Sequence, residues 1–202
     1  MKAIITVLIL TLSSSFLLAQ NDSPAVWKTL SKISYKKDLL CRAVGFKKQE
    51  SFKLFDGTLG FGRDACHLLS FGCHVLGCEK NPVMFALIND AYQRLNLEFR
   101  ERFRILHGHS GDHLAGNTTS VDCLYLDPMF EDVKKKSAPK KQMAFLREVG
   151  FEETQIPGLI KRGIELGIKR VVVKRPINGE HLYMKPKTTF SGKVVRYDVY
   201  TR

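Results

Sequence analysis

Short apolar runs alternate with helix-like stretches along the chain from Phe52 onward. Such alternation is typical of an α/β fold with a mostly parallel sheet. The runs that predict strands cover residues 52–55, 73–78, 103–107, 121–126 and 170–173. A further run at residues 194–200 alternates apolar and polar positions, which indicates an antiparallel strand at the edge of the sheet.

Helices are predicted between these strands from apolar spacing and from the residues at their ends. Residues 64–70 form one of them, with Gly72 placed to terminate it. Asn81 and Pro82 open the next, because asparagine caps a helix and proline fits its first position. Helices are also predicted at residues 31–45 and 157–166.

The first 34 residues admit two interpretations. Met1-Lys2 followed by an apolar run resembles the start of a secretory signal, but serines interrupt the run and Leu17 stands where a cleavage site needs a small residue. The alternative is a short β-meander with strands at residues 4–12, 16–20 and 25–30. We expect a small β-rich extension at 1–34 and one α/β domain at 35–202.

Charge narrows the class of partner. The net charge is +12 at pH 7, from 32 Lys and Arg against 20 Asp and Glu. This excess favours a polyanion such as RNA, DNA or an anionic membrane surface, although a generally basic protein would also carry it. The five cysteines lack the spacing of a disulfide framework or a zinc site, and the six histidines form no ligand set. We therefore expect buried thiols and no metal.

A glycine-rich turn follows the first predicted strand. Gly57, Gly60 and Gly62 are spaced as GxxGxG, and not as the GxGxxG that seats a pyrophosphate at a helix N-terminus. The charge of Asp56 at the strand end would repel phosphates but suits a ligand with a cationic or amino-acid portion. Glu79 ends the second strand, where an acid can accept hydrogen bonds from ribose hydroxyls. Either feature alone is weak, because such turns are often mere connections and such acids mere surface groups. Together they favour an adenosyl ligand, and S-adenosylmethionine (SAM) in particular.

The tetrapeptide Asp127-Pro128-Met129-Phe130 ends the fourth predicted strand. Strand ends line the ligand crevice of an open α/β sheet, so the tetrapeptide should lie beside the glycine turn. The lone pair of an exocyclic base amine is delocalised into the base. The Asp127 carboxylate and the Pro128 carbonyl can accept the amine hydrogens and aim the lone pair at a methyl group. Phe130 offers a face on which the base can stack. Asp-Pro also ends strands at ordinary turns, but in this context it predicts methylation of a base amine.

Two basic elements stand where they can contact RNA phosphates. One follows the tetrapeptide and contains Lys134, Lys135, Lys136, Lys140 and Lys141. The other is Lys174-Arg175, at the end of the fifth predicted strand, which should open onto the same crevice. Charge runs are often only solvated. Their place beside the predicted reaction site favours RNA contact.

The motifs together resemble the RsmJ family of small-subunit ribosomal RNA guanine-N2 methyltransferases. The resemblance spans about residues 35–200, and its pair of stretches DPMF and KRVVVKRP is quite specific. The stretches that carry it are residues 56–64 (DGTLGFGRD), 79–82 (EKNP), 125–130 (YLDPMF), 135–138 (KKSA), 140–143 (KKQM) and 169–176 (KRVVVKRP).

The resemblance implies a Rossmann-like class I methyltransferase fold, with a mostly parallel seven-stranded sheet and an antiparallel C-terminal strand. It implies SAM as cofactor and, as substrate, the N2 amine of a guanine in 16S ribosomal RNA, free or in the small ribosomal subunit. It also implies a cytoplasmic protein without a membrane partner, because SAM is made and used inside the cell. Carried over by position, the cofactor contacts would be Arg63, Asp64, Glu79, Lys80, His109, Ser110 and Asp127.

The chain departs from the family pattern in three places. Residues 35–38 (YKKD) replace a glycine-rich basic run, and His109-Ser110 replaces a pair of small hydroxyl residues. The N-terminal region is short and diverged. The residues themselves leave open an adenine-N6 methyltransferase of DNA or RNA, since the same acceptors serve that amine, and a non-catalytic RNA-binding protein on the same fold. A nicotinamide oxidoreductase fits the glycine spacing poorly.

Overall fold

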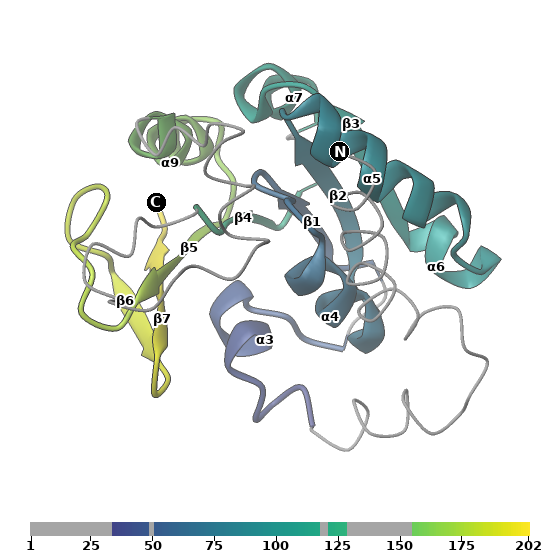
Figure 1. Cartoon of the computed structure of the whole chain (residues 1–202). Coiled ribbons are helices and arrows are strands. Elements are labelled where there is room, and N and C mark those ends of the chain that lie inside the picture. The colour runs from purple at the N-terminus through teal and green to yellow at the C-terminus, as the bar shows by residue number, and fades with distance from the viewer. Residues whose placement is uncertain (1–33, 49–50, 118–120, 129–154) are drawn as a thin grey trace, which may run out of the picture.

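The computed structural model describes residues 34–48, 51–117, 121–128 and 155–202. Most of the expected N-terminal extension lies outside these ranges, as do Met129, Phe130 and the basic run at 134–141. The described residues form a seven-stranded sheet with helices on both faces (Figure 1). The predicted α/β architecture is therefore confirmed.

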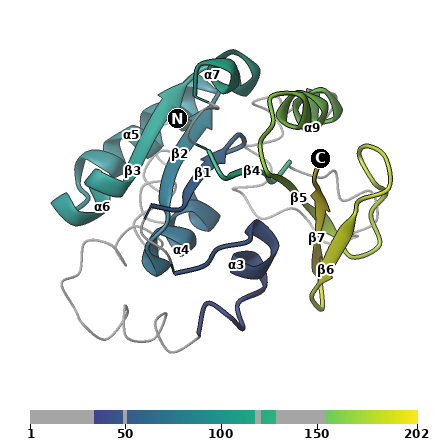
Figure 2. The same cartoon turned by 180° about the vertical axis from the view of Figure 1, so that it is seen from behind.

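Each of the five parallel strands coincides with a predicted apolar run. They are β1 (Lys53–Asp56), β2 (His74–Glu79), β3 (Phe103–His107), β4 (Cys123–Leu126) and β5 (Arg170–Pro176). The strand order is β3-β2-β1-β4-β5-β7-β6, which Figure 2 shows from left to right. The four residues of β4 are all buried, as expected where helices cover both faces of a parallel sheet.

The antiparallel strand β7 (Val195–Tyr200) lies between β5 and β6 (Thr188–Ser191). The prediction of an antiparallel strand is confirmed, but its placement at the edge is wrong because β6 is the edge strand. Three of the four β6 residues are exposed, so an apolar pattern could not reveal this strand. Its pairing with β7 makes it extended.

Three predicted helices connect the parallel strands. They are α4 (Arg63–Phe71), α5 (Pro82–Gln93) and α9 (Ile156–Glu165). Gly72 ends α4 at φ 103°, and the Asn81 side chain accepts hydrogen bonds from the first backbone N–H groups of α5, as the sequence predicts. Two short helices, α6 (Leu97–Arg102) and α7 (Ser110–Asn117), are additional. Within the described ranges, no helix is long and apolar enough to cross a bilayer.

The helix predicted at residues 31–45 is shorter where the structure describes it. It is α3 (Leu39–Val44), and Asp38 sets its start because its Oδ1 accepts a hydrogen bond from the Cys41 N–H at 2.8 Å. The other Asp38 oxygen lies 2.9 Å from His67 Nε2. The cap of α3 is thereby fastened to α4.

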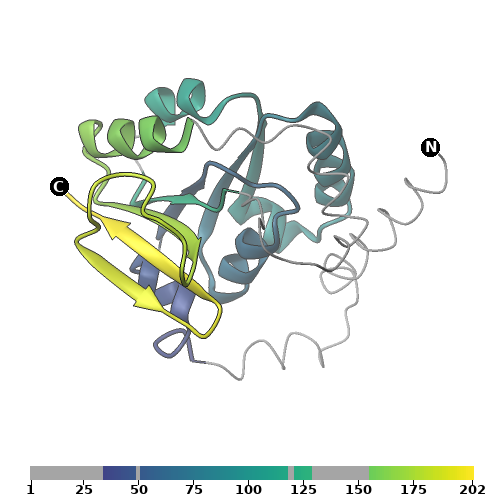
Figure 3. The same cartoon turned by 60° about the vertical axis from the view of Figure 1, so that its left-hand side comes forward.

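The helices divide into two layers (Figures 1 and 3). Side chains of α3, α4 and α5 share one core with Val172, and side chains of α7 and α9 share another with Val171 and Val173. Successive residues of β5 therefore face opposite layers. Four of the five cysteines are buried, and all five are free thiols.

The strand order reverses between β1 and β4. The chain moves from β1 to β2 and β3 on one side, and then returns to place β4 on the other side of β1. In open α/β sheets the ligand crevice lies at the carboxyl ends of the strands, where this reversal occurs. Asp56 ends β1 and Asp127 follows β4, so both acids lie at this point.

Candidate active site

The glycine turn after β1 is bonded to both neighbouring strands. Gly57 N donates to Tyr125 O of β4 at 2.9 Å, and Leu59 N donates to Cys78 O of β2 at 3.0 Å. Gly60 and Gly62 have φ values of 52° and 67°, a region that favours glycine. A Cβ atom on Gly60 would meet nothing closer than 3.8 Å, so the backbone is open to a ligand there.

Asp56 and Glu79 are both buried at this edge, each with 2% of the residue exposed. Glu79 accepts hydrogen bonds from Gly60 N and Asn81 N, both at 2.8 Å, which ties the glycine turn to the start of α5. Burial raises the pKa of Glu79, and these two hydrogen bonds oppose the rise. Asp56 accepts one backbone hydrogen bond, from Thr58 N at 3.1 Å. Burial, with a smaller contribution from nearby carboxylates, raises the pKa of Asp56 to about 8.

Asp127 lies beside the same turn, as the sequence predicts. Its backbone N donates to Thr58 Oγ1 at 2.6 Å. Its carboxylate Oδ2 lies 2.8 Å from Lys174 Nζ, and the same ammonium lies 2.8 Å from Asp64 Oδ2. The Tyr125 hydroxyl donates to that Asp64 oxygen. Residues of β4, β5 and α4 thus meet in one polar cluster.

The protonation of this cluster follows from its burial and its charges. Burial raises the pKa of Asp127 to about 6; Asp64 adds to the rise and Lys174 opposes it. Burial works against the charge of Lys174, but Asp127 and Asp64 outweigh it and raise the pKa of that ammonium. Near neutral pH the cluster therefore contains an ionised Asp127 and a charged Lys174.

The remaining expected cofactor residues are spread around the turn. Ser110 is buried and donates from its hydroxyl to Gly57 O, which joins the start of α7 to the turn. His109 and Arg63 are exposed, and Lys80 is half-buried at the end of β2. Pro128 is buried directly after Asp127. The expected contacts of these residues with a cofactor stay predictions.

Lys174 and Arg175 point to opposite faces of β5. Lys174 faces Asp64 and Asp127, whereas Arg175 is buried and donates from Nε to Glu180 O at 2.9 Å. The expectation that both side chains open onto one crevice is not met, because neighbouring residues of a strand alternate between its faces. Phe130 and the five lysines of the basic run lie outside the described residues. RNA contact by any of these residues stays a prediction.

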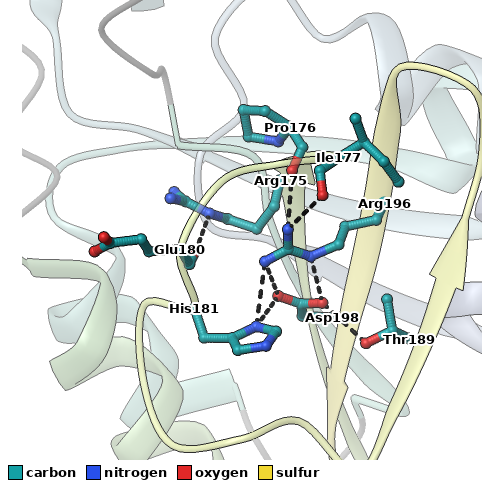
Figure 4. A network of polar contacts seen from close by, with 8 residues as sticks. All are labelled: Arg175, Pro176, Ile177, Glu180, His181, Thr189, Arg196 and Asp198. Carbon is teal, nitrogen blue, oxygen red and sulfur yellow. Dashed lines mark hydrogen bonds and ion pairs between the residues drawn. The ribbon is translucent and has the colours of Figure 1, made fainter.

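Arg175 belongs to a second polar network, drawn in Figure 4, at the β5–β7–β6 end of the sheet. Arg196 holds Asp198 with two hydrogen bonds, of 3.0 and 3.1 Å, and donates to the carbonyls of Pro176 and Ile177. His181 Nδ1 lies 2.8 Å from Asp198 Oδ2. The network joins three strands and the segment between β5 and β6.

Comparisons with known proteins give the family of this chain. A family model of SAM-dependent methyltransferases (SAM_MT) matches residues 20–202. The chain is 37% identical over 177 residues to ribosomal RNA small subunit methyltransferase J of Pseudoalteromonas atlantica, covering 82% of this chain and 69% of that protein. The same protein of Shewanella sediminis is 38% identical over 170 residues, covering 81% of this chain and 66% of that protein. The chain belongs to the methyltransferase J family.

Solved structures support the fold of this methyltransferase J family member. A SAM-dependent methyltransferase from Neisseria gonorrhoeae matches with a TM-score of 0.64 and 29% identity, covering 81% of this chain and 70% of that one. The METTL16 methyltransferase domain matches with a TM-score of 0.53 and 13% identity, which shows the fold alone. The seven-stranded mixed sheet is thus that of a class I methyltransferase. The chain spans about two thirds of the length of the curated relatives, 66% and 69% in the two above.

The site of this methyltransferase J family member fits a cationic adenosyl ligand. Asp56, Glu79, Asp64 and Asp127 gather at one edge of the sheet, with Lys174 bound between two of them. Such an excess of carboxylates favours a ligand with positive groups, which SAM has in its sulfonium and amino groups. The backbone at Gly60, which donates to Glu79, leaves open the space that a side chain would fill there.

Two residues of the site, Thr58 and Tyr125, were not expected from the sequence, and Lys174 was expected there only as an RNA contact. Thr58 binds the backbone of Asp127, Tyr125 binds Asp64, and Lys174 joins the two acids. A register argument could have found Lys174, since Leu126 pairs with Val173 and the next residue on each strand is Asp127 or Lys174. Thr58 and Tyr125 carried no comparable signal.

Proposed function

We propose that this chain transfers a methyl group from SAM to the exocyclic N2 amine of a guanine in 16S ribosomal RNA. The observation that carries the proposal is the Asp127 carboxylate, fixed beside the glycine turn at the reversal of strand order. The names of the relatives, ribosomal RNA small subunit methyltransferase J, supply the class of RNA. We further propose that the chain acts in the cytoplasm, where SAM and ribosomes occur together.

The chemistry follows from what Asp127 and Pro128 can accept. The amine donates hydrogen bonds to the Asp127 carboxylate and the Pro128 carbonyl, so its lone pair is aimed at the methyl carbon. Bound SAM supplies a methyl carbon activated by a sulfonium leaving group. The methyl group would pass to the amine nitrogen and leave SAM as a neutral thioether, while Asp127 would accept the proton that the amine loses and pass it to water.

Recognition of the RNA rests on charge. The net charge of +12 favours a polyanion, and the lysines at 134–141 follow Asp127-Pro128 closely in the chain. We propose that these lysines bind phosphates around the target nucleotide and that Phe130 stacks on the guanine. A paired guanine would have to leave its helix to reach the site, at a cost of roughly a few kcal/mol.

The proposal is tested with purified protein, SAM carrying a labelled methyl group, and 16S ribosomal RNA, both free and in assembled small subunits. Wild-type protein should place label in N2-methylguanosine after digestion of the RNA to nucleosides. Asp127→Asn should lower the rate by about 100-fold or more, because the variant loses the ionised acceptor. Asp90→Asn is the matched control, since Asp90 is 61% exposed and pairs with Arg94 on α5.

Two results would contradict the proposal. Label found only in N6-methyladenosine would show that the chain is an adenine methyltransferase. RNA binding without methyl transfer, together with no SAM binding by calorimetry, would show a non-catalytic RNA-binding protein on this fold.

A further inference from the structure

Lys174 is held by two carboxylates from different elements. Its ammonium lies 2.8 Å from Asp64 Oδ2 on α4 and 2.8 Å from Asp127 Oδ2 after β4. The side chain is 21% exposed, so most of it is removed from solvent. An RNA phosphate that bound this ammonium would have to compete with two ion pairs already made.

Asp64 is itself fixed, which makes it an anchor for Lys174. The Tyr125 hydroxyl donates to Asp64 Oδ2, and Asp64 lies in the first turn of α4. Tyr125 is buried on β4, the strand that leads into Asp127. A chain of contacts therefore runs from Tyr125 on β4 through Asp64 and Lys174 to Asp127, which directly follows the same strand.

The charges around Asp127 make this lysine necessary for an ionised acceptor. Among the residues that the structure describes, the groups that act on the Asp127 carboxylate are Asp56 from β1, Asp64 from α4, Tyr125 from β4, Tyr197 from β7 and Lys174 from β5. Lys174 is the cation in this set, and the other members are acids or neutral phenols. Without it, Asp127 would face carboxylates in a partly buried place and would take up a proton more readily.

We propose that Lys174 is a positioning residue for Asp127, which it holds ionised and oriented toward the substrate amine, while Asp64 and Tyr125 hold Lys174. The inference rests on the proposed function of Asp127 as acceptor. A protonated Asp127 would present one hydrogen-bond donor where the amine needs an acceptor. The lysine therefore serves the reaction without touching either substrate.

The chain offers a matched control for this proposal. Lys169 lies 2.8 Å from Asp122, a distance equal to that of the Lys174 pairs, but it precedes the opposite end of β5 and is 79% exposed. Lys169→Met and Lys174→Met remove the same charge and the same kind of ion pair. Lys174→Arg keeps the charge and tests rescue, because a guanidinium can still bind both carboxylates.

The variants are compared by kcat, by the KM for 16S ribosomal RNA, and by the pH dependence of kcat. Lys174→Met should lower kcat by about 10- to 100-fold near neutral pH, with the KM for RNA within about twofold of wild type. In the wild type, kcat should rise with pH around the Asp127 pKa of about 6. In Lys174→Met this rise should occur at higher pH. Lys174→Arg should keep the wild-type position of this rise, and Lys169→Met should match wild type throughout.

Two outcomes would overturn the inference. A raised KM for RNA with an unmoved pH profile would make Lys174 a phosphate contact. A lower melting temperature with wild-type kcat and pH profile would make it merely structural. Carboxyl NMR of the protein without substrate provides a separate measure, because Lys174→Met should raise the pKa of Asp127. If the wild type transfers no methyl group to 16S ribosomal RNA, the proposed function fails, while the NMR titration still decides whether Lys174 keeps Asp127 ionised.

Discussion

Asp56 and Glu79 are buried acids at the same edge of the sheet, but they differ in the number of hydrogen bonds that their carboxyl groups accept. Burial raises the pKa of both, but Glu79 accepts two backbone hydrogen bonds that oppose the rise, whereas Asp56 accepts one and its pKa is raised to about 8. The pKa in the folded chain is above the ordinary value near 4. The contribution of Asp56 to stability is therefore fully present below about pH 4 and is lost as pH rises through about 8.

A cationic ligand should reverse this preference of Asp56 for its proton. SAM bound beside Asp56 would favour the ionised carboxylate, so SAM affinity should increase as pH rises toward about 8 and level off above it, with release of a proton on binding below that pH. The measurement is calorimetry from about pH 6 to 9 in buffers of different ionisation enthalpy.

Asp56→Asn is the comparison for that titration, because it removes the carboxyl group and keeps its size. The difference in SAM affinity between wild type and Asp56→Asn should grow with pH. A difference that stays constant would mean that Asp56 does not titrate with the ligand.

Among the elements, the glycine turn is shaped by close packing as well as by its backbone angles. A Cβ atom on Gly57 would lie 2.8 Å from a Leu126 methyl group, and one on Gly62 would lie 2.7 Å from a methyl group of Ile88. The turn therefore fits between β4 and α5 only because Gly57 and Gly62 carry no side chain.

Gly62→Ala should both destabilise the protein and weaken SAM binding. The added methyl group meets Ile88 at a position with φ 67°, which should cost about 1–3 kcal/mol and displace the turn. Gly72→Ala is the control, because φ is 103° there and nothing lies within 4 Å of the added atom. It should lower stability without changing SAM affinity. Equal SAM affinity in the two variants, measured by calorimetry, would contradict this account of the turn.

The sequence predicts those bounds of helices and strands that are set by residues close together in the chain. The bounds of β3 at residues 103–107 and the start of α5 at Pro82 agree with the structure, because apolar runs and helix caps are local signals. The contact of Lys174 with Asp127 spans 47 positions and depends on which strands pair. A local pattern therefore placed Lys174 at this edge of the sheet but could not predict its ion pairs with Asp64 and Asp127.

Tertiary pairing also determines the burial of charged residues at the other end of the sheet. Arg175, Arg196 and Asp198 look like surface charges in the sequence, yet Asp198 is fully buried and the two arginines are less than 10% exposed. Each has partners on another strand or loop. Burial of charged groups of this kind is set by tertiary pairing, which the pattern of apolar positions does not encode.

The Arg196–Asp198 pair connects β5, β6, β7 and the segment between β5 and β6 (Figure 4). Asp198→Ala leaves the Arg196 guanidinium buried without its carboxylate, which should lower the free energy of unfolding by about 3–5 kcal/mol. Denaturant titration measures this loss. Asp90→Ala, which breaks the exposed pair with Arg94, should cost less than about 1 kcal/mol. Similar losses in the two variants would show that the buried network adds little.

The charge of the whole molecule should make its affinity for RNA depend on salt concentration. Replacing Lys134, Lys135 and Lys136 with glutamine should reduce the slope of log affinity against log salt concentration by about one for each phosphate that the variant no longer binds. The control is the same replacement at Lys36, Lys37 and Lys161, which are exposed, because it removes an equal charge. Equal slopes in the two triple variants would mean that net charge alone, and not the run beside Asp127, binds the RNA.

The strand order has a consequence for synthesis on the ribosome. β1 and β4 are neighbours although their paired residues are 69 positions apart. One edge of β1 therefore stays unpaired for roughly 3–14 s, the time in which the ribosome synthesises the chain up to β4. β7 is made after β6 but must enter between β6 and β5. Nascent chains therefore carry unpaired strand edges, which invite aggregation. Chaperones that cover such edges should therefore improve the soluble yield of this protein.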